Sequence, residues 1–180
     1  RNIMTNLVSL GFNAARAAIR RGEALPEPDP DAPQGSILIP VPLFHVTGTN
    51  SLMCPAVAGG AKIVLMHKWN PERFLELVEE EKVTTTTGVP AMVWQVLESP
   101  DFHKRDLSSL QGYGYGGAAI APELTLRFAK QFDWFAPGQG YGATETSSVS
   151  VGNSGEDYLR HPDSVGLPVP CVDLKVVDEA

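Results

Sequence analysis

Cysteine and long apolar runs are both scarce in this sequence of 180 residues. Its two cysteines, Cys54 and Cys171, are far apart, form no CxxC pair and have no histidine at metal-ligand spacing. This pattern argues against a disulfide framework or a zinc site and favours reduced thiols in a cytoplasmic protein. No apolar run is long enough to span a bilayer, and no signal peptide is evident. We therefore expect a cytoplasmic protein without a transmembrane segment.

Basic clusters are lacking too, because 14 Lys and Arg residues are scattered among 21 Asp and Glu, which gives a net charge of −7. The nearest approach to a cluster is formed by Arg16, Arg20 and Arg21. These residues stand near the end of a predicted helix, where positive charge complements the helix dipole. We therefore expect neither a nucleic-acid partner nor an anionic-membrane surface.

What the sequence does contain is an alternation of strand and helix patterns. Strand candidates occupy residues 36–41, 61–66, 83–87 and 134–136. Helical patterns occupy 2–20 and 46–59 and begin again at Asn70, Pro90 and Pro122. Near-continuous apolar strands alternating with helices are typical of a parallel sheet that is covered on both faces. The prediction is an α/β fold with a mostly parallel, doubly wound sheet.

Burial within two helices is also predicted. In 2–20 the apolar positions of one face are expected to be buried, namely Met4, Leu7, Val8, Ala14, Ala15 and Ala18. The acidic run 79–81 is expected on the solvated face of the helix that begins near Asn70.

The last residues show a different pattern. Val172, Leu174 and Val176 alternate with charged residues, which indicates a half-exposed strand of period two. We interpret this strand as the start of a separate antiparallel β subdomain. The predicted division is a central α/β subdomain over 1–163 and the beginning of the next, β subdomain over 164–180.

The stretch 138–145, Gly-Gln-Gly-Tyr-Gly-Ala-Thr-Glu, carries the strongest functional pattern. Glycines at three alternate positions let the backbone approach a ligand closely. Tyr141 offers a ring for stacking, Thr144 a hydroxyl donor, and Glu145 an oxygen ligand of the kind that Mg²⁺ accepts. This combination predicts a nucleotide site with its metal. The alternative is a glycine-rich connection whose Thr and Glu cap the next segment.

The position of this stretch favours a site. In parallel α/β sheets, ligands bind outside the carboxyl ends of the strands. We place residues 44–45, 88–89, 116–117 and 138–145 at such strand ends and expect them to converge at that edge.

Four short motifs resemble those of the adenylate-forming superfamily, which comprises acyl-CoA synthetases, luciferases and the adenylation domains of peptide synthetases. Residues 138–145 resemble its Tyr-Gly-x-Thr-Glu motif, and 116–118 its Gly-Gly-Ala turn. Residues 42–48 resemble its Pro-Leu-Phe-His segment, and 164–168 its Ser-x-Gly-x-Pro turn. The motifs occur in the family's order and cover nearly the whole chain. The histidine after Pro-Leu-Phe resembles fatty-acid and aryl-acid CoA ligases more than amino-acid-activating domains.

The resemblance implies a role for each matching position. The residues implied in nucleotide binding are Gly116, Gly117, Ala118, Gly140, Tyr141, Gly142 and Thr144. Tyr141 would stack on adenine, Thr144 would bind the phosphate, and Glu145 would hold Mg²⁺. The residues implied around the acyl pocket are His45, Val89, Gly114 and Gly140. Thr144, Glu145 and His45 are the implied catalytic residues.

The implied reaction is attack of a carboxylate on the α-phosphate of ATP, which gives acyl-AMP, followed by transfer of the acyl group to coenzyme A. The family's lysine-bearing phosphate loop is expected before Arg1, and its ribose-binding aspartate and C-terminal catalytic domain after Ala180. We therefore expect a central fragment of an ATP-dependent acyl-CoA synthetase that is inactive on its own and needs the remaining N- and C-terminal parts.

The expected substrate is a fatty or aryl acid, because no Asp or Glu occurs in 46–60 or 85–94, the segments nearest the expected pocket. An amino acid would require a buried carboxylate to pair with its ammonium group.

Two other classes remain open, namely a peptide-synthetase adenylation module and a non-enzymatic flavodoxin-like module that binds a nucleotide or a partner. From the residues alone His45 is more typical of a packing histidine. The other three histidines are expected at the surface, namely His67, His103 and His161.

Overall fold

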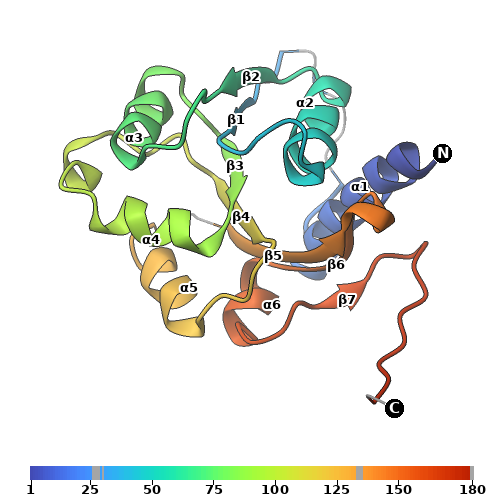
Figure 1. Cartoon of the computed structure of the whole chain (residues 1–180). Coiled ribbons are helices and arrows are strands. Elements are labelled where there is room, and N and C mark those ends of the chain that lie inside the picture. The colour runs from blue at the N-terminus through green and yellow to red at the C-terminus, as the bar shows by residue number, and fades with distance from the viewer. Residues whose placement is uncertain (26–28, 30, 133–135, 179–180) are drawn as a thin grey trace.

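The computed structural model describes residues 1–25, 29, 31–132 and 136–178 (Figure 1). Within these ranges the strands form one seven-stranded sheet in the order β2-β1-β3-β4-β5-β6-β7. Their bounds are β1 Ser36–Ile39, β2 Lys62–Leu65, β3 Thr85–Gly88, β4 Gly112–Gly116, β5 Ala136–Ala143, β6 Ser148–Ser154 and β7 Leu167–Pro168. Strands β1 to β5 pair in parallel, whereas β6 and β7 are antiparallel to their neighbours. The predicted α/β fold with a mostly parallel sheet is confirmed.

Helices cover both faces of this sheet, with α3, α4 and α5 on one side and α1 and α2 on the other (Figure 1). The α-helices are α1 Asn2–Arg20, α2 Cys54–Ala58, α3 Pro71–Glu80, α4 Pro90–Glu98, α5 Pro122–Ala129 and α6 Gly155–Arg160. A π-helical segment, η1 Thr47–Met53, leads into α2, and short 3-10 turns form η2 Phe102–Lys104 and η3 Thr144–Thr146. No helix in the described ranges is both long enough and apolar enough to cross a membrane.

The start of α3 shows how local sequence determines an element. The Asn70 side chain accepts a hydrogen bond from the Arg73 backbone N–H at 2.6 Å, and Pro71 occupies the first helical position, where its missing N–H costs nothing. Proline also begins α4 and α5, at Pro90 and Pro122. The three predicted helix starts are therefore confirmed.

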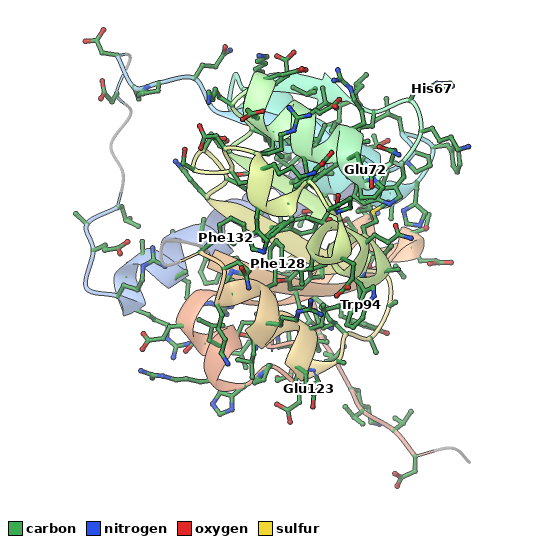
Figure 2. All side chains as sticks on the ribbon, turned by 90° about the vertical axis from the view of Figure 1, so that its left-hand side faces the viewer. His67, Glu72, Trp94, Glu123, Phe128 and Phe132 are labelled. Atoms are coloured by element: carbon green, nitrogen blue, oxygen red, sulfur yellow. The ribbon has the colours of Figure 1, made fainter. Side chains whose placement is uncertain are left out.

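The core lies between the sheet and the α3–α5 side. Tyr113 of β4 is almost fully buried and packs its ring against Phe74 of α3 and Phe128 of α5, with centroid distances of 5.9 and 5.5 Å. Phe128 in turn packs against Phe132 at 5.4 Å. Figure 2 shows both phenylalanines behind the helices of this side, while His67 projects from the edge of the molecule. This aromatic packing fixes which face of β4 is turned to the core.

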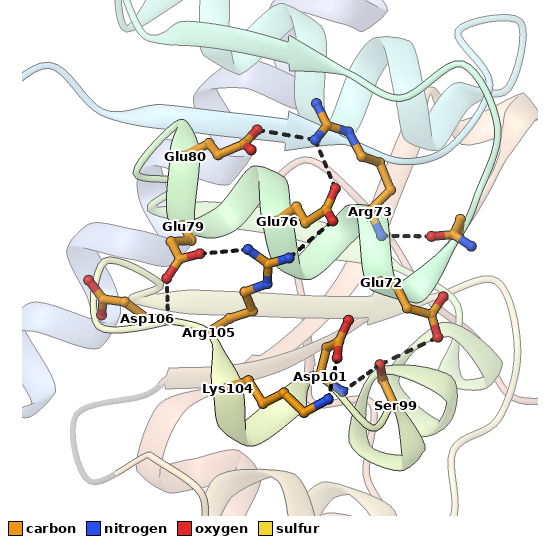
Figure 3. Close-up of polar contacts among 11 residues, drawn as sticks. Glu72, Arg73, Glu76, Glu79, Glu80, Ser99, Asp101, Lys104, Arg105 and Asp106 are labelled. Carbon is orange, nitrogen blue, oxygen red and sulfur yellow. Dashed lines mark hydrogen bonds and ion pairs between the residues drawn. The ribbon is translucent and has the colours of Figure 1, made fainter.

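A charged network ties the segment after α4 to α3 (Figure 3). Arg105 donates to Glu76 and Glu79, each at 3.0 Å, and Glu79 also accepts the Asp106 backbone N–H at 2.9 Å. These contacts, the Asp106 N–H foremost and then Arg105, lower the pKa of the Glu79 carboxyl. The expectation that 79–81 lies on the solvated face is confirmed, because none of its side chains is buried, and Glu80 and Glu81 form further ion pairs at this surface.

Two glycine-rich stretches form strands. Residues 138–143 were expected as a turn after a strand, but they lie within β5, and residues 112–116, which were not among the strand candidates, form β4. Glycine lowers strand propensity, yet the ladders on both sides of these strands supply the backbone hydrogen bonds that hold them extended. The predicted apolar strand at 134–136 falls mostly outside the described residues, which resume at Ala136.

The predicted strand over 172–176 is not formed in the described part of the chain, where these residues are extended and largely exposed. A period-two pattern needs a partner strand, and no described segment pairs with it. Instead β7 joins the main sheet through Val151↔Pro168 and Gly152↔Leu167. The subdomain boundary between 163 and 164 stays a prediction.

Candidate functional site

One patch of the sheet carries no side chains. Alternate residues of a strand face opposite sides, so the burial of Tyr113 and Tyr115 in the core turns Gly114 and Gly116 toward α1 and η1. The register extends this patch across three strands, because Gly114 pairs with Gly138, Gly116 with Gly140, and Gly140 with Gly152. We call these five residues the glycine floor: Gly114, Gly116, Gly138, Gly140 and Gly152.

A cleft of about 460 Å³ lies over the glycine floor. Helix α1 lines it with Leu10, Asn13 and Arg16, and the start of η1 contributes Thr47. Close packing explains one glycine of the floor, since a Cβ at Gly114 would approach the Thr87 hydroxyl oxygen to 2.7 Å. Because the glycine floor has no side chains, space remains between this face of the sheet and helix α1, and this space is the cleft.

Most of the residues expected in the site line this one cleft. Those that line it are His45, Gly114, Gly116, Gly117, Gly140, Tyr141, Gly142 and Thr144. Three expected residues do not line it, namely Val89, Ala118 and Glu145. Val89 lies just beyond the rim, because a Cβ at Gly117 would be 3.9 Å from its Cγ1. Ala118 and Glu145 are exposed and directly follow residues that do line the cleft.

The turn that carries Thr144 and Glu145 is held by other residues. The Thr146 hydroxyl accepts the Ala143 backbone N–H at 3.0 Å, and the Asn50 side chain of η1 donates to the Ser147 carbonyl at 3.1 Å. Thr146, not Thr144 or Glu145, therefore makes the capping contact at this turn. In the described part of the chain Glu145 forms no ion pair, so its carboxylate is free for an external ligand.

His45 is exposed at the edge of the cleft and is not a packing histidine. Its Nδ1 accepts a hydrogen bond from the Thr47 backbone N–H at 3.1 Å. In the neutral ring this contact places the proton on Nε2. His67, His103 and His161 are exposed, as expected.

The part of the site that the sequence did not reveal comes from α1. The predicted buried face of this helix is confirmed only at Ala18: Met4 is 64% and Val8 70% exposed, whereas Asn6 and Ser9 are buried. Asn6 donates to the Asn50 carbonyl at 3.2 Å, and the Ser9 hydroxyl lies 3.1 Å from the Cys171 sulfur. These polar contacts turn the helix so that Asn13 and Arg16 meet the cleft. Only the three- and four-residue spacing of Asn6, Ser9, Asn13 and Arg16 could have indicated this face.

The described residues that line the cleft carry charge of one sign only. No lining residue in the described chain is an Asp or Glu, and Arg16 is the lining residue that carries a permanent charge. No group of three metal-ligating side chains occurs among the residues described. The cleft can therefore accept neutral or anionic groups, whereas a cationic group would find no acidic partner.

Comparisons with known proteins agree with this arrangement. A family model described as "AMP-binding enzyme" matches residues 1–180. The chain is 34% identical over 145 residues to 4-coumarate–CoA ligase CCL1 of Humulus lupulus, an alignment that covers 79% of this chain and 26% of that protein. It is 32% identical over 178 residues to 4-coumarate–CoA ligase-like 5 of Oryza sativa subsp. japonica, covering 99% of this chain and 32% of that one.

Solved structures show the same likeness. The o-succinylbenzoate CoA synthetase MenE from Bacillus subtilis, in complex with the acyl-adenylate intermediate OSB-AMP, superposes with a TM-score of 0.74 at 26% identity. The superposition covers 99% of this chain and 32% of MenE. A second MenE structure, in complex with ATP and a magnesium ion, also gives a TM-score of 0.74.

The chain spans 26% to 32% of the length of the two ligases it matches. The family match nevertheless covers every residue of the chain. The chain therefore belongs to the family of AMP-binding, adenylate-forming enzymes.

Proposed function

We propose that these residues form the central part of an ATP-dependent acid–CoA ligase. The enzyme would activate a carboxylic acid as acyl-AMP and transfer the acyl group to coenzyme A. The observation that carries the proposal is the cleft over the glycine floor, which opens beside Tyr141 and Thr144 in a chain of this family. An acyl group would lie over the floor, and the nucleotide would lie at the carboxyl ends of the strands.

The nucleotide half of the site is supported by exposed and unpaired groups. Tyr141 is 56% exposed, so its ring is available for stacking on adenine. Gly117 has φ of 75°, a conformation that favours glycine and turns the backbone of 116–118 back at the end of β4. Thr144 lines the cleft beside Tyr141 and would donate its hydroxyl to the α-phosphate.

Magnesium fits the same edge. Mg²⁺ keeps several waters and usually binds through one or two carboxylates together with phosphate oxygens. Glu145 offers one such carboxylate next to Thr144, and the related MenE was solved with ATP and a magnesium ion. When bound, the ion would neutralise negative charge that gathers on the phosphates as the carboxylate attacks the α-phosphate and pyrophosphate leaves.

The acid half of the site excludes a positively charged substrate. An unpaired ammonium group in a closed cleft costs several kcal/mol, and the described lining offers it no carboxylate. We therefore propose a fatty or aryl acid rather than an α-amino acid. The relatives described above, which are 4-coumarate and o-succinylbenzoate ligases, favour the aryl class.

The experiment is an acid panel with the full-length protein that contains these residues. The protein is incubated with ATP, Mg²⁺, coenzyme A and fatty, aryl or α-amino acids, and the release of AMP and acyl-CoA is measured. We expect AMP and acyl-CoA in equal amounts with an unsubstituted acid. Preference for an α-amino acid without thioester formation would indicate an adenylation module instead, and no acid-dependent AMP at all would indicate a binding module.

The isolated 180-residue chain is the companion sample in the same assay. We expect no acyl-AMP from it, because the family's phosphate loop and catalytic lysine do not occur in this sequence. Sustained turnover by the chain alone would refute its proposed role as one part of a larger active site.

A further inference from the structure

Arg16 is a positively charged side chain without an acidic partner in the wall of the cleft. Sequence reasoning assigned it, with Arg20 and Arg21, to the helix dipole. The structure separates the three: Arg20 pairs with Asp157 at 2.5 Å and Arg21 with Glu23 at 2.6 Å. Arg16 forms no ion pair within the described chain and instead lines the cleft over the glycine floor, half-buried.

Among the described residues, the Arg16 guanidinium contacts an aromatic ring and keeps its N–H donors free. The group lies over the Phe12 ring with its central carbon 5.9 Å from the ring centroid. A cation–π contact of this kind orients the guanidinium but uses none of its five N–H groups as hydrogen-bond donors to an acceptor oxygen. A planar fork of donors, held in place and facing a cleft, matches the geometry of a carboxylate.

A second polar group beside Arg16 also lacks a partner. The Oδ1 atom of Asn13 is buried and makes no hydrogen bond to any residue that the structure describes, although a buried polar atom without a partner is costly. Asn13 lies one turn before Arg16 on α1, and both residues line the same two adjoining clefts. Either orientation of the amide would let Asn13 contact a bound polar group there.

Arg16 lies at the end of the cleft that is remote from the nucleotide edge. Arg16 also lines a smaller adjoining cleft of about 240 Å³, together with Ser154 and Asp157. Ser154 pairs with Gly138, and Gly138 precedes Gly142 by four residues along β5, a span of about 13 Å. An anion at Arg16 would therefore be far from the phosphates that Thr144 is proposed to bind.

We infer that the acid activated at this site carries a second negatively charged group, at the end remote from the reacting carboxylate, and that Arg16 binds this group with Asn13 beside it. The substrate class is thus a dicarboxylic acid, aliphatic or aromatic. This inference rests on the proposed function and names the substrate class of the same cleft. Arg16 acts as a specificity-determining residue.

The test compares matched acids with the full-length protein. Succinic, adipic, suberic and terephthalic acid are each paired with the monocarboxylic acid that has a methyl group in place of one carboxyl. We expect at least one diacid to have the higher kcat/KM of its pair. The Arg16→Gln variant should lower the ratio of diacid to monoacid about 10- to 100-fold, the range for hydrogen bonds to a charged group.

Three controls separate this role from others. Arg21→Gln, at the end of the same helix, removes the same charge outside both clefts and should leave the ratio within about twofold. Arg16→Lys keeps the charge and should retain part of the preference. The KM for ATP should not rise in Arg16→Gln; a rise for ATP with no change in the acid ratio would show that Arg16 binds phosphate and would overturn the inference.

The failure of this inference differs from the failure of the proposed function. If monoacids are adenylated at least as well as every diacid, or if Arg16→Gln leaves the ratio unchanged, the dicarboxylate is refuted while the ligase activity stands. If no acid of the panel supports AMP release, both are refuted.

Discussion

Substitution of Gly140 by alanine tests whether the acid lies over the glycine floor. A Cβ built on Gly140 would lie 3.5 and 3.8 Å from the Val149 methyl carbons and 3.9 Å from the Val151 carbonyl oxygen, which are ordinary contact distances. The fold therefore accommodates the methyl group without rearrangement. The methyl group would therefore occupy part of the cleft, in the middle of the glycine floor.

The size of the expected effect depends on the acid. A flexible chain that loses contact over one methylene loses about 0.8 kcal/mol, or about fourfold in kcat/KM. A rigid aryl acid is overpacked instead, which typically costs about 1–3 kcal/mol, or about 5- to 150-fold. A short acid that does not reach Gly140 should change by less than about twofold.

The assay is kcat/KM of the full-length protein across acids of increasing size, together with the urea-unfolding midpoint of each variant. Gly35→Ala is the matched control, because its Cβ would also meet only ordinary contacts, 3.7 Å from the Thr84 hydroxyl oxygen, and Gly35 lies outside the cleft. Equal activity of Gly140→Ala and wild type with every acid would refute the placement of the acid over the floor.

Three further predictions concern the metal ligand, the charged network and α1. Glu145→Gln should lower the adenylation rate about 10²–10³-fold, with partial rescue by excess Mg²⁺, and an unchanged rate across a Mg²⁺ titration would remove Glu145 from the site. The pKa values of Glu79, Asp101 and Asp106 are lowered in the fold, chiefly by the Asp106 backbone N–H, by Lys104 and by Ser108 respectively. The folded state then binds fewer protons than the unfolded state, so this stabilisation is fully present above the ordinary values of 3.8 and 4.5 and is lost as the pH falls from these values through the lowered pKa values of the folded state. Arg105→Gln should weaken the decrease of the urea midpoint between about pH 5 and about pH 2, and an identical decrease in both proteins would contradict this. Gly11→Ala should stabilise the protein by about 0.5–1 kcal/mol, because Gly11 is interior to α1 and a Cβ there meets nothing within 4 Å. A lower unfolding midpoint for this variant would contradict the placement of Gly11 in the helical interior of α1 with open space at its Cβ position.

Local signals in the sequence were sufficient to predict those elements that are determined by backbone conformation and backbone hydrogen bonding. Asn70 and Pro71 specify a helix start by hydrogen bonding and by a fixed φ, and α3 begins there. The alternation of strand and helix patterns was sufficient to predict the parallel sheet, because apolar strands must be covered by helices on both faces. Three of the four motifs, 42–48, 116–118 and 138–145, contribute residues to one cleft, because neighbouring strands of the sheet carry them there.

What the sequence did not reveal depends on tertiary contacts. Glycine at alternate positions of 138–143 indicates a turn by propensity, whereas pairing on both sides makes these residues a strand. The apolar face of α1 predicted burial of Val8, but contacts of Asn6 and Ser9 turn that face outward. The sequence also led us to assign Arg16 to the helix dipole. No local pattern shows which side of a helix faces a cleft.

The most direct test of the account is a structure of the full-length protein with a non-hydrolysable acyl-AMP analogue, in which a sulfamoyl group replaces the phosphate. We predict the acyl chain against Gly114 and Gly140 of the glycine floor. The adenine should lie between Tyr141 and the 116–118 turn, with the Thr144 hydroxyl on the sulfamoyl oxygens. An acyl chain outside the cleft, or an adenine without contact to Tyr141, would contradict the assignment of this site.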